Sequence, residues 1–288
     1  MPDGPALVLL AASLWGTTGT AQALGPEGIT SATVGLVRMA GGCLLWLWVW
    51  AGRTAVPWRA FLSPAALAAM GAMAASQPLF FAGVDKAGVA VGTIVTIGSG
   101  PVLAGALAFV VRGERVGRRW TLATAAAVVG ALMLLSGGES AGVDPAGVGF
   151  ALGAGVAWAI YLVAAKALLE RVPPTVFAAV VFTGATLLLL PVLLLQSLAW
   201  VGTVRGALLA LWLGVATTAI SYLFFANGLR ATPVATTATL TLAEPLTAAL
   251  LGILILDERL GAVAATGAAL LMAGLLVVSA VPDRTLRA

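Results

Sequence analysis

The tetrapeptide Leu79-Phe80-Phe81-Ala82 recurs 144 residues later as Leu223-Phe224-Phe225-Ala226, and this repetition decides the fold. The same shift aligns three further features: Pro101 with Pro245, Glu114-Arg115 with Glu258-Arg259, and Gly117 with Gly261. Several ungapped matches at one shift indicate an internal duplication. The chain is therefore expected to consist of two copies of one structural unit.

The composition is that of a membrane protein. Hydrophobic residues make up 61% of the chain and charged residues 9%, whereas a soluble domain is about 25% charged. No polar stretch is long enough for a separate soluble domain. The net charge of +4 arises from basic residues at the ends of apolar segments, where they meet lipid headgroups. We expect the lipid bilayer, and no nucleic acid, as a partner.

The chain has no histidine and one cysteine, Cys43. A transition-metal site or catalysis by a histidine base is therefore not expected. The sequence predicts no metal, no cofactor and no enzymatic activity. The N-terminus has no basic residue before the first apolar run, so no cleavable signal peptide is expected.

Ten apolar segments have the length of a membrane-spanning helix, about 20 residues. They cover residues 5–23, 31–51, 62–84, 88–111, 118–137, 146–169, 174–197, 205–228, 233–256 and 262–281. Helices are expected because the backbone needs internal hydrogen-bond partners in lipid, and the segments lack the alternation of barrel strands. The predicted fold is an all-α integral membrane protein with ten transmembrane helices.

Five helices per copy is an odd number, so the second copy should be inverted relative to the first. The predicted units are residues 1–137 and 146–288, each a five-helix repeat. A Gly-rich linker over 138–145 should join them. Two inverted copies are typical of secondary transporters, which bind their substrate at the repeat interface.

Charge predicts the orientation in the membrane. With the N-terminus inside, eleven basic residues lie in inner segments and three in outer ones, namely Lys86, Arg205 and Arg259. Because cytoplasmic segments carry an excess of Lys and Arg, both termini are expected in the cytoplasm.

Two charged residues lie within predicted spans, Arg38 and Glu244. An ionisable group in the bilayer normally faces a cavity or a partner. Both residues are predicted to bind substrate, and Glu244 is a candidate for proton coupling. An ion pair between them would offset part of the free-energy cost of placing each charge in the bilayer. The alternatives are a structural Arg38 bonded to carbonyls and a structural Glu244 that caps a broken helix.

The repeat singles out Glu244, because its counterpart 144 residues earlier is Gly100. One copy has Gly100-Pro101 where the other has Glu244-Pro245. A proline inside a helix removes a backbone hydrogen bond, and such breaks are tolerated where they line a cavity. Hinges or helix breaks are predicted at Pro78, Gly100, Pro101 and Pro245.

Further polar residues share helix faces with these positions. Thr237, Thr241 and Glu244 follow the spacing i, i+4, i+7 and so lie on one face. Thr93 precedes Gly100 on the equivalent face, and Gln77 lies within the third span. We predict a polar-lined substrate cavity that includes Gln77, Thr93, Thr237 and Thr241. The alternative is hydrogen bonding between helices, which such side chains commonly provide.

Four aromatic residues lie within spans, away from the membrane interfaces: Trp15, Trp158, Tyr161 and Tyr222. A buried indole or phenol needs a hydrogen-bond partner. These residues are predicted to line the cavity and contact an apolar substrate group. Ordinary packing in the core is the alternative.

These features together resemble the EamA-type carriers of the drug/metabolite transporter superfamily. The resemblance is carried by the stretch from Glu244-Pro245 to Glu258-Arg259, by Leu14-Trp15-Gly16 and by Arg38. The chain is similar to bacterial members that export aromatic amino acids. The resemblance implies a bacterial inner-membrane carrier. One difference between the copies is the segment Gly98-Ser99-Gly100-Pro101, which carries no charge where the second copy has Glu244.

The resulting hypothesis is an alternating-access exporter of small metabolites, chiefly amino acids that include aromatic ones. Arg38 would attract a carboxylate, and Glu244 would meet an amine or carry a proton. A carrier of cationic drugs is the first alternative. A channel is the second, although channels usually use rings of equivalent groups, which Gly100 and Glu244 are not.

Overall fold

The computed structural model describes residues 3–136, 144–257 and 259–280, and within them every regular element is a helix. This confirms the all-α fold. The long helices are α1 (Gly4–Ala23), α4 (Pro64–Ala87), α5 (Val89–Arg112), α6 (Arg118–Leu135), α7 (Pro145–Leu169), α8 (Pro174–Leu194) and α13 (Ala262–Ala280). Each forms because an apolar segment in lipid can satisfy its backbone only internally.

Three predicted spans are built from shorter pieces. The second consists of α2 (Ser31–Gly41), η1 (Gly42–Leu44) and α3 (Leu45–Ala51). The eighth consists of α9 (Val204–Leu211), the π-helix η4 (Trp212–Ile220) and α10 (Ser221–Ala231). The ninth consists of α11 (Val234–Leu240) and α12 (Ala243–Leu256). Two short 3₁₀ turns, η2 (Trp58–Leu62) and η3 (Ala199–Gly202), precede α4 and α9.

In the described part of the chain, nine helical stretches are long and apolar enough to cross a membrane. The protein is thus a multi-pass membrane protein. The exception among the ten predicted spans is α1, which has 20 residues. Its second half carries Gly16-Thr17-Thr18-Gly19-Thr20, and these small polar residues lower its hydropathy.

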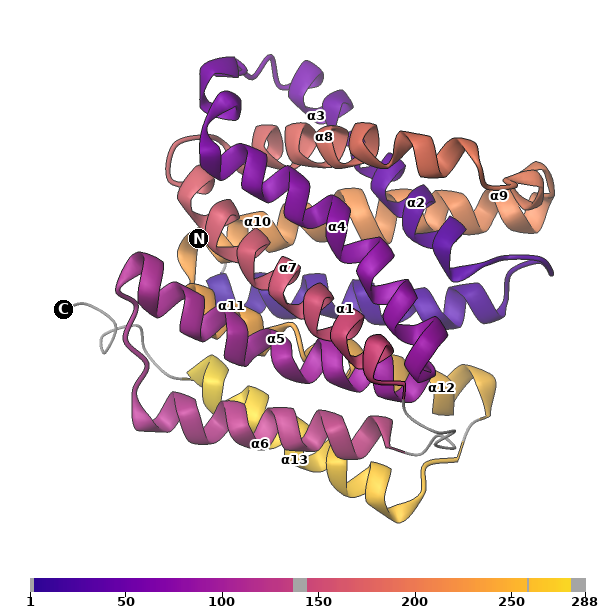
Figure 1. Cartoon of the computed structure of the whole chain (residues 1–288), viewed down its shortest axis with the longest axis vertical. Coiled ribbons are helices and arrows are strands. Elements are labelled where there is room, and N and C mark those ends of the chain that lie inside the picture. Colours follow the sequence, from indigo (N-terminus) through magenta and orange to yellow (C-terminus); the bar gives the residue numbers. More distant parts are fainter. Residues whose placement is uncertain (1–2, 137–143, 258, 281–288) are drawn as a thin grey trace.

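The helix contacts follow the two repeats. The third span, α4, packs on α7, and its repeat counterpart α10 packs on α1. Likewise, α5 packs on α7, and its repeat counterpart α12 packs on α1. The last helices of the two repeats, α6 and α13, lie side by side along one edge of the bundle (Figure 1). Each repeat therefore completes the packing of the other.

Small residues allow the closest of these approaches. A methyl group at Gly267 of α13 would lie 2.6 Å from the carbonyl oxygen of Gly130 on α6. One at Gly274 would lie 2.6 Å from the carbonyl oxygen of Ala123. Such contacts are the usual means of helix association in membranes.

Some predictions fall outside the described residues. They are most of the linker over 138–145, Glu258 of the second Glu-Arg pair, and the C-terminal residues after Ala280. The boundaries of the two repeats and their inverted orientation stay predictions.

Candidate functional site

The four aromatic residues selected from the sequence meet in one cluster. Trp15 of α1 lies 5.9 Å from Trp158 of α7 and 4.9 Å from Tyr222 of α10, measured between ring centroids. Trp158 stacks on Tyr161, one turn further along α7, at 5.2 Å. The cluster therefore joins a helix of the first repeat to two helices of the second.

A fifth ring, Phe225, was missed by the sequence analysis. It lies 5.2 Å from Trp15, 5.8 Å from Trp158 and 6.3 Å from Tyr161. Two signals in the sequence pointed to it. Phe225 belongs to the repeated Leu-Phe-Phe-Ala motif, and it follows Tyr222 by three residues, which places both on one helix face.

The rings differ in exposure. Trp15 is 3% exposed, Tyr161 0% and Tyr222 5%, so these three are buried in the core. Trp158 is only partly buried. A Cβ at Gly100 of α5 would lie 3.7 Å from the Trp158 indole, with no other atom within 4 Å. Trp158 is thus the least buried of these four rings, and a side chain at the buried Gly100 would contact its indole.

The π-helix η4 positions the polar partner of Trp15. The indole N–H of Trp15 donates to Ser221 Oγ at 2.9 Å, and Ser221 in turn donates to the carbonyl of Thr217 at 2.8 Å. The side-chain hydroxyl of Thr218 donates to the carbonyl of Leu213 at 2.8 Å. A π-helix is often found at functional sites, and its wider turn here directs Ser221 toward α1.

Arg38 and Glu244 approach this cluster from α2 and α12. Arg38 lies within electrostatic reach of both Glu244 and Tyr222. Among the described residues both ion pairs involve Arg112, so the direct Arg38–Glu244 pair expected from the sequence is not formed. The Nε of Arg38 is buried without a hydrogen-bond partner. Its capacity to bind an anion is therefore unused.

Glu244 lies directly after the interruption between α11 and α12. Its backbone N–H donates to the carbonyl of Thr241 at 3.0 Å, a tight i to i−3 turn. Gly16 of α1 packs against this turn, because a Cβ there would lie 2.6 Å from the Glu244 carbonyl oxygen. The glycine beside Trp15 thereby brings α1 onto the backbone that carries the carboxylate.

The helix breaks predicted at Pro78 and at Gly100-Pro101 are not present as interruptions. Both α4 and α5 run through these residues. One proline removes one hydrogen bond, and the helix resumes where its neighbours hold both sides. Only the prediction at Pro245 falls beside a break, and hinge motion at any of these residues stays a prediction.

The remaining predicted polar residues do not behave alike. Thr237 is fully buried, and its hydroxyl has no partner. The Thr241 hydroxyl donates to the carbonyl of Ala238 at 2.7 Å, within its own helix. The Gln77 amide donates to the neighbouring Ser76 hydroxyl at 3.4 Å. Thr93 is partly exposed on α5. Among these predicted residues, Thr237 is therefore the one whose buried hydroxyl has no partner.

A multi-pass helical bundle with two repeats, and with unpaired charges beside an aromatic cluster, is the architecture of a membrane carrier. The sequence matches the EamA-like transporter family over residues 3–136 and 145–280. It is 42% identical, over 96% of this chain and 94% of the relative, to the uncharacterized transporter YwfM of Bacillus subtilis strain 168. The chain belongs to the EamA-like transporter family.

A solved crystal structure has the same fold. It superposes with a TM-score of 0.82 at 21% sequence identity and covers 99% of each chain. At this identity the likeness concerns the fold alone. The family resemblance read from the sequence is thus confirmed, and membership identifies the chain as a membrane transporter of small molecules.

Proposed function

We propose that the protein is a bacterial inner-membrane exporter of amino acids, with aromatic amino acids among its substrates. It would have ten transmembrane helices in two inverted repeats, with both termini in the cytoplasm. Transport would proceed by alternating access around a site near the middle of the bundle.

The proposal depends chiefly on the unpaired state of Arg38 and Glu244. A charged group within the bilayer is costly unless it has a partner or a function. These two lie within electrostatic reach of each other, yet no ion pair joins them within the described chain. A zwitterionic amino acid supplies a carboxylate for the guanidinium and an ammonium for the carboxylate.

The aromatic cluster supports the substrate class. Trp158 is partly exposed and has only a glycine, Gly100, facing it from α5, and a substrate ring would stack on its indole. Trp15, Tyr161 and Tyr222 would form the wall behind it. The unpaired hydroxyl of Thr237 is a further candidate for the polar end of the substrate, and Gln77, Thr93 and Thr241 would complete the polar lining.

Glu244 would also couple transport to protons. The Glu244 carboxylate would pair with the substrate ammonium in one half of the cycle. When the substrate leaves, another positive charge must replace that ammonium. A proton is the smallest such replacement. Competition between proton and substrate for one carboxylate then makes export respond to a pH gradient.

Counterflow in proteoliposomes tests the proposal. The purified carrier is preloaded with unlabelled substrate, and uptake of radiolabelled phenylalanine, tryptophan, alanine or tetraphenylphosphonium is measured with and without a pH gradient. Saturable counterflow of the aromatic amino acids is the expected result. Counterflow of tetraphenylphosphonium alone would identify a carrier of organic cations, and uptake that does not saturate would identify a channel.

A further inference from the structure

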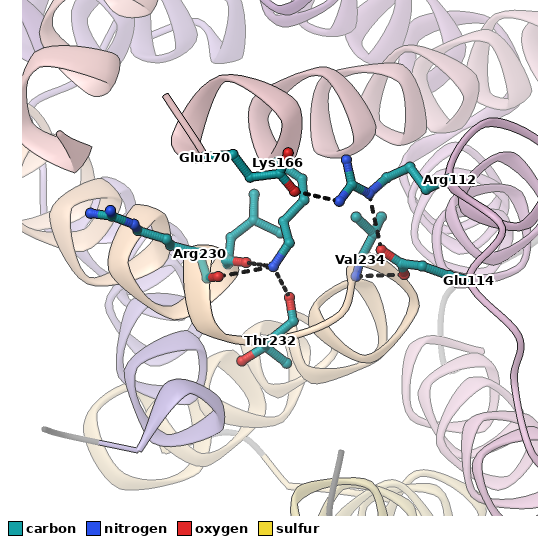
Figure 2. Close-up of polar contacts among 8 residues, drawn as sticks. Arg112, Glu114, Lys166, Glu170, Arg230, Thr232 and Val234 are labelled. Carbon is teal, nitrogen blue, oxygen red and sulfur yellow. Dashed lines mark hydrogen bonds and ion pairs between the residues drawn. The ribbon is translucent and has the colours of Figure 1, made fainter. Parts of the chain in front are cut away.

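Four charged side chains hold one connection between helices at the end of the bundle predicted to face the cytoplasm. We call them the inner clamp: Arg112 at the end of α5, Glu114 just beyond it, and Lys166 and Glu170 at the end of α7. Figure 2 shows them around the turn between α10 and α11, with Lys166 and Glu114 reaching different parts of it and Arg112 between Glu114 and Glu170. No role follows for them from the sequence alone.

Glu114 links the two repeats through a backbone contact. Its Oε2 accepts the backbone N–H of Val234, the first residue of α11, at 2.9 Å. The first N–H groups of a helix have no partner within the helix, and a carboxylate there is also favoured by the helix dipole. The carboxylate is 13% exposed, so water competes weakly for this contact.

Arg112 extends the link to α7. Its Nε lies 3.2 Å from Glu114 Oε1, and its Nη2 lies 2.6 Å from Glu170 Oε1. One guanidinium thus joins a carboxylate of the first repeat to one of the second. Glu170 is 52% exposed, which makes this half of the arrangement sensitive to salt.

Lys166 holds the other side of the same turn. Its ammonium donates to the carbonyls of Leu229, Arg230 and Thr232 at 2.8, 2.9 and 3.0 Å. A lysine has three N–H donors, and all three fit these contacts. The end of α10 and the start of α11 are therefore both held, one by α7 and the other by the segment after α5.

The repeat-related positions, which are expected at the opposite end of the bundle, lack most of the clamp. Under the shift of 144 residues, Arg112 corresponds to Leu256, Glu170 to Pro26 and Lys166 to Gln22. Only Glu114 has an acidic counterpart in the sequence, Glu258, which lies outside the described residues. The charged network is a property of one end, and the fold itself does not require it.

We propose that the inner clamp keeps the cytoplasmic end of the carrier closed and must open once in each transport cycle. This rests on the proposed alternating-access function, in which the repeats move relative to each other. Glu114 and Arg112 bridge those repeats, so they cannot keep their contacts when that end opens. Glu114 also acts as a positioning residue, because α11 begins at Val234 and leads directly to Thr237 and Glu244.

Cysteine accessibility tests the clamp without any substrate. Ala235 of α11 is 2% exposed. It lies close to α5, because a Cβ added at Gly105 would be 3.8 Å from the Cβ of Ala235. In a Cys43→Ser background, A235C therefore reports separation of α11 from α5. The labelling rate is measured with a small methanethiosulfonate in membranes made permeable, so that both ends are exposed to reagent.

Two variants open the clamp in different ways. Arg112→Leu introduces the residue of the other repeat and removes both ion pairs, while Glu114→Ala removes the contact to Val234. We expect each to raise the labelling rate about tenfold, as loss of a charge-assisted contact shifts the closed-to-open ratio. Arg115→Leu is the matched control, an exposed neighbouring arginine, and should leave the rate unchanged. Arg112→Lys keeps a charge and should restore part of the closure.

An unchanged rate in Glu114→Ala overturns the proposal, and so does an equal increase in Arg115→Leu. If the variants are not monodisperse in detergent, the unmutated clamp is tested by raising the salt concentration from about 0.05 M to about 1 M, which shortens the screening length several-fold. Faster labelling of A235C at high salt supports the clamp, and an unchanged rate overturns it. Failure of amino acid counterflow would instead overturn the proposed substrate and leave the labelling result standing.

Discussion

The fourth and ninth spans are the same helix in the two repeats, yet only the ninth is interrupted. The fourth, α5, runs unbroken from Val89 to Arg112 through Gly100-Pro101. The ninth stops at Leu240 and resumes at Ala243, just before Glu244-Pro245. Since both contain the proline at the same place, the proline alone does not cause the break.

The difference lies in how the freed carbonyl is used. Pro245 has no N–H to donate to the carbonyl of Thr241, four residues earlier, and the Glu244 N–H takes that carbonyl instead. The backbone tightens, and Gly16 of α1 packs on the turn. At the equivalent place in α5, a Cβ on Gly100 would meet only the Trp158 ring within 4 Å. One repeat thus supplies a carboxylate on a tight turn, and the other supplies room.

The strongest test of this contrast is Glu244→Gln. We expect amino acid counterflow to fall roughly 100-fold, because a charge-assisted hydrogen bond contributes up to about 3 kcal/mol. The response to a pH gradient should be lost as well. Glu27→Gln, which removes an exposed acid elsewhere, is the control. Full transport and full pH response in Glu244→Gln would show that the carboxylate is structural.

Arg38→Ala should have the next largest effect. The guanidinium has a buried Nε without a partner, and we assign it to the substrate carboxylate. Counterflow of phenylalanine should fall about tenfold or more, while uptake of phenethylamine, which lacks the carboxylate, should change little. Equal losses for both compounds would contradict this assignment. Monodispersity in detergent must be checked first.

Gly16→Ala probes the tight turn from the side of α1. The new methyl group would lie 2.6 Å from the Glu244 carbonyl oxygen and 2.7 Å from Thr247 Cβ. Because both neighbours belong to a packed helix, we expect a loss of about 1–3 kcal/mol in stability. Thermal unfolding in detergent measures it. Gly19→Ala on the same helix, where a Cβ meets no atom within 4 Å, should be neutral.

Trp158→Ala tests whether the open side of the cluster binds a ring. Aromatic pairs contribute about 0.5–1.5 kcal/mol beyond burial, so aromatic substrates should lose several-fold in counterflow rate. Alanine should be affected much less. Equal losses for alanine and tryptophan would argue that Trp158 only packs.

The smallest effect is expected for Gly100→Ala. Its Cβ would make ordinary contact with the Trp158 indole at 3.7 Å and meet nothing else within 4 Å, so counterflow should change by less than about twofold. Gly100→Leu fills the space beside the ring and should reduce transport of aromatic substrates selectively. If Gly100→Ala destabilised the protein as much as Gly16→Ala, the contrast between the two repeats would be wrong.

Much of the fold could be predicted because hydropathy and the 144-residue repeat are properties of the sequence itself. The meeting of Trp15, Trp158, Tyr161 and Tyr222 was also predictable, since each is an amphipathic ring within a span. The π-helix was not predictable, because its backbone hydrogen bonds between residues five apart leave no pattern in the hydropathy of the sequence. Nor was the inner clamp, since the partner of Arg112 on α7 lies 58 residues away.

The π-helix gives the eighth span more residues than an α-helix of the same length would hold. Its turns hold more residues per unit length than an α-helix, and the surplus lies within Trp212–Ile220. If the surplus moved along by one residue, the side chains it passed would rotate by about 100°, the angle between successive residues of an α-helix. The ends of the helix would stay in place. Ser221 and Tyr222 lie just beyond the π-helix, so such a shift would rotate these two neighbours of Trp15 without tilting the whole span.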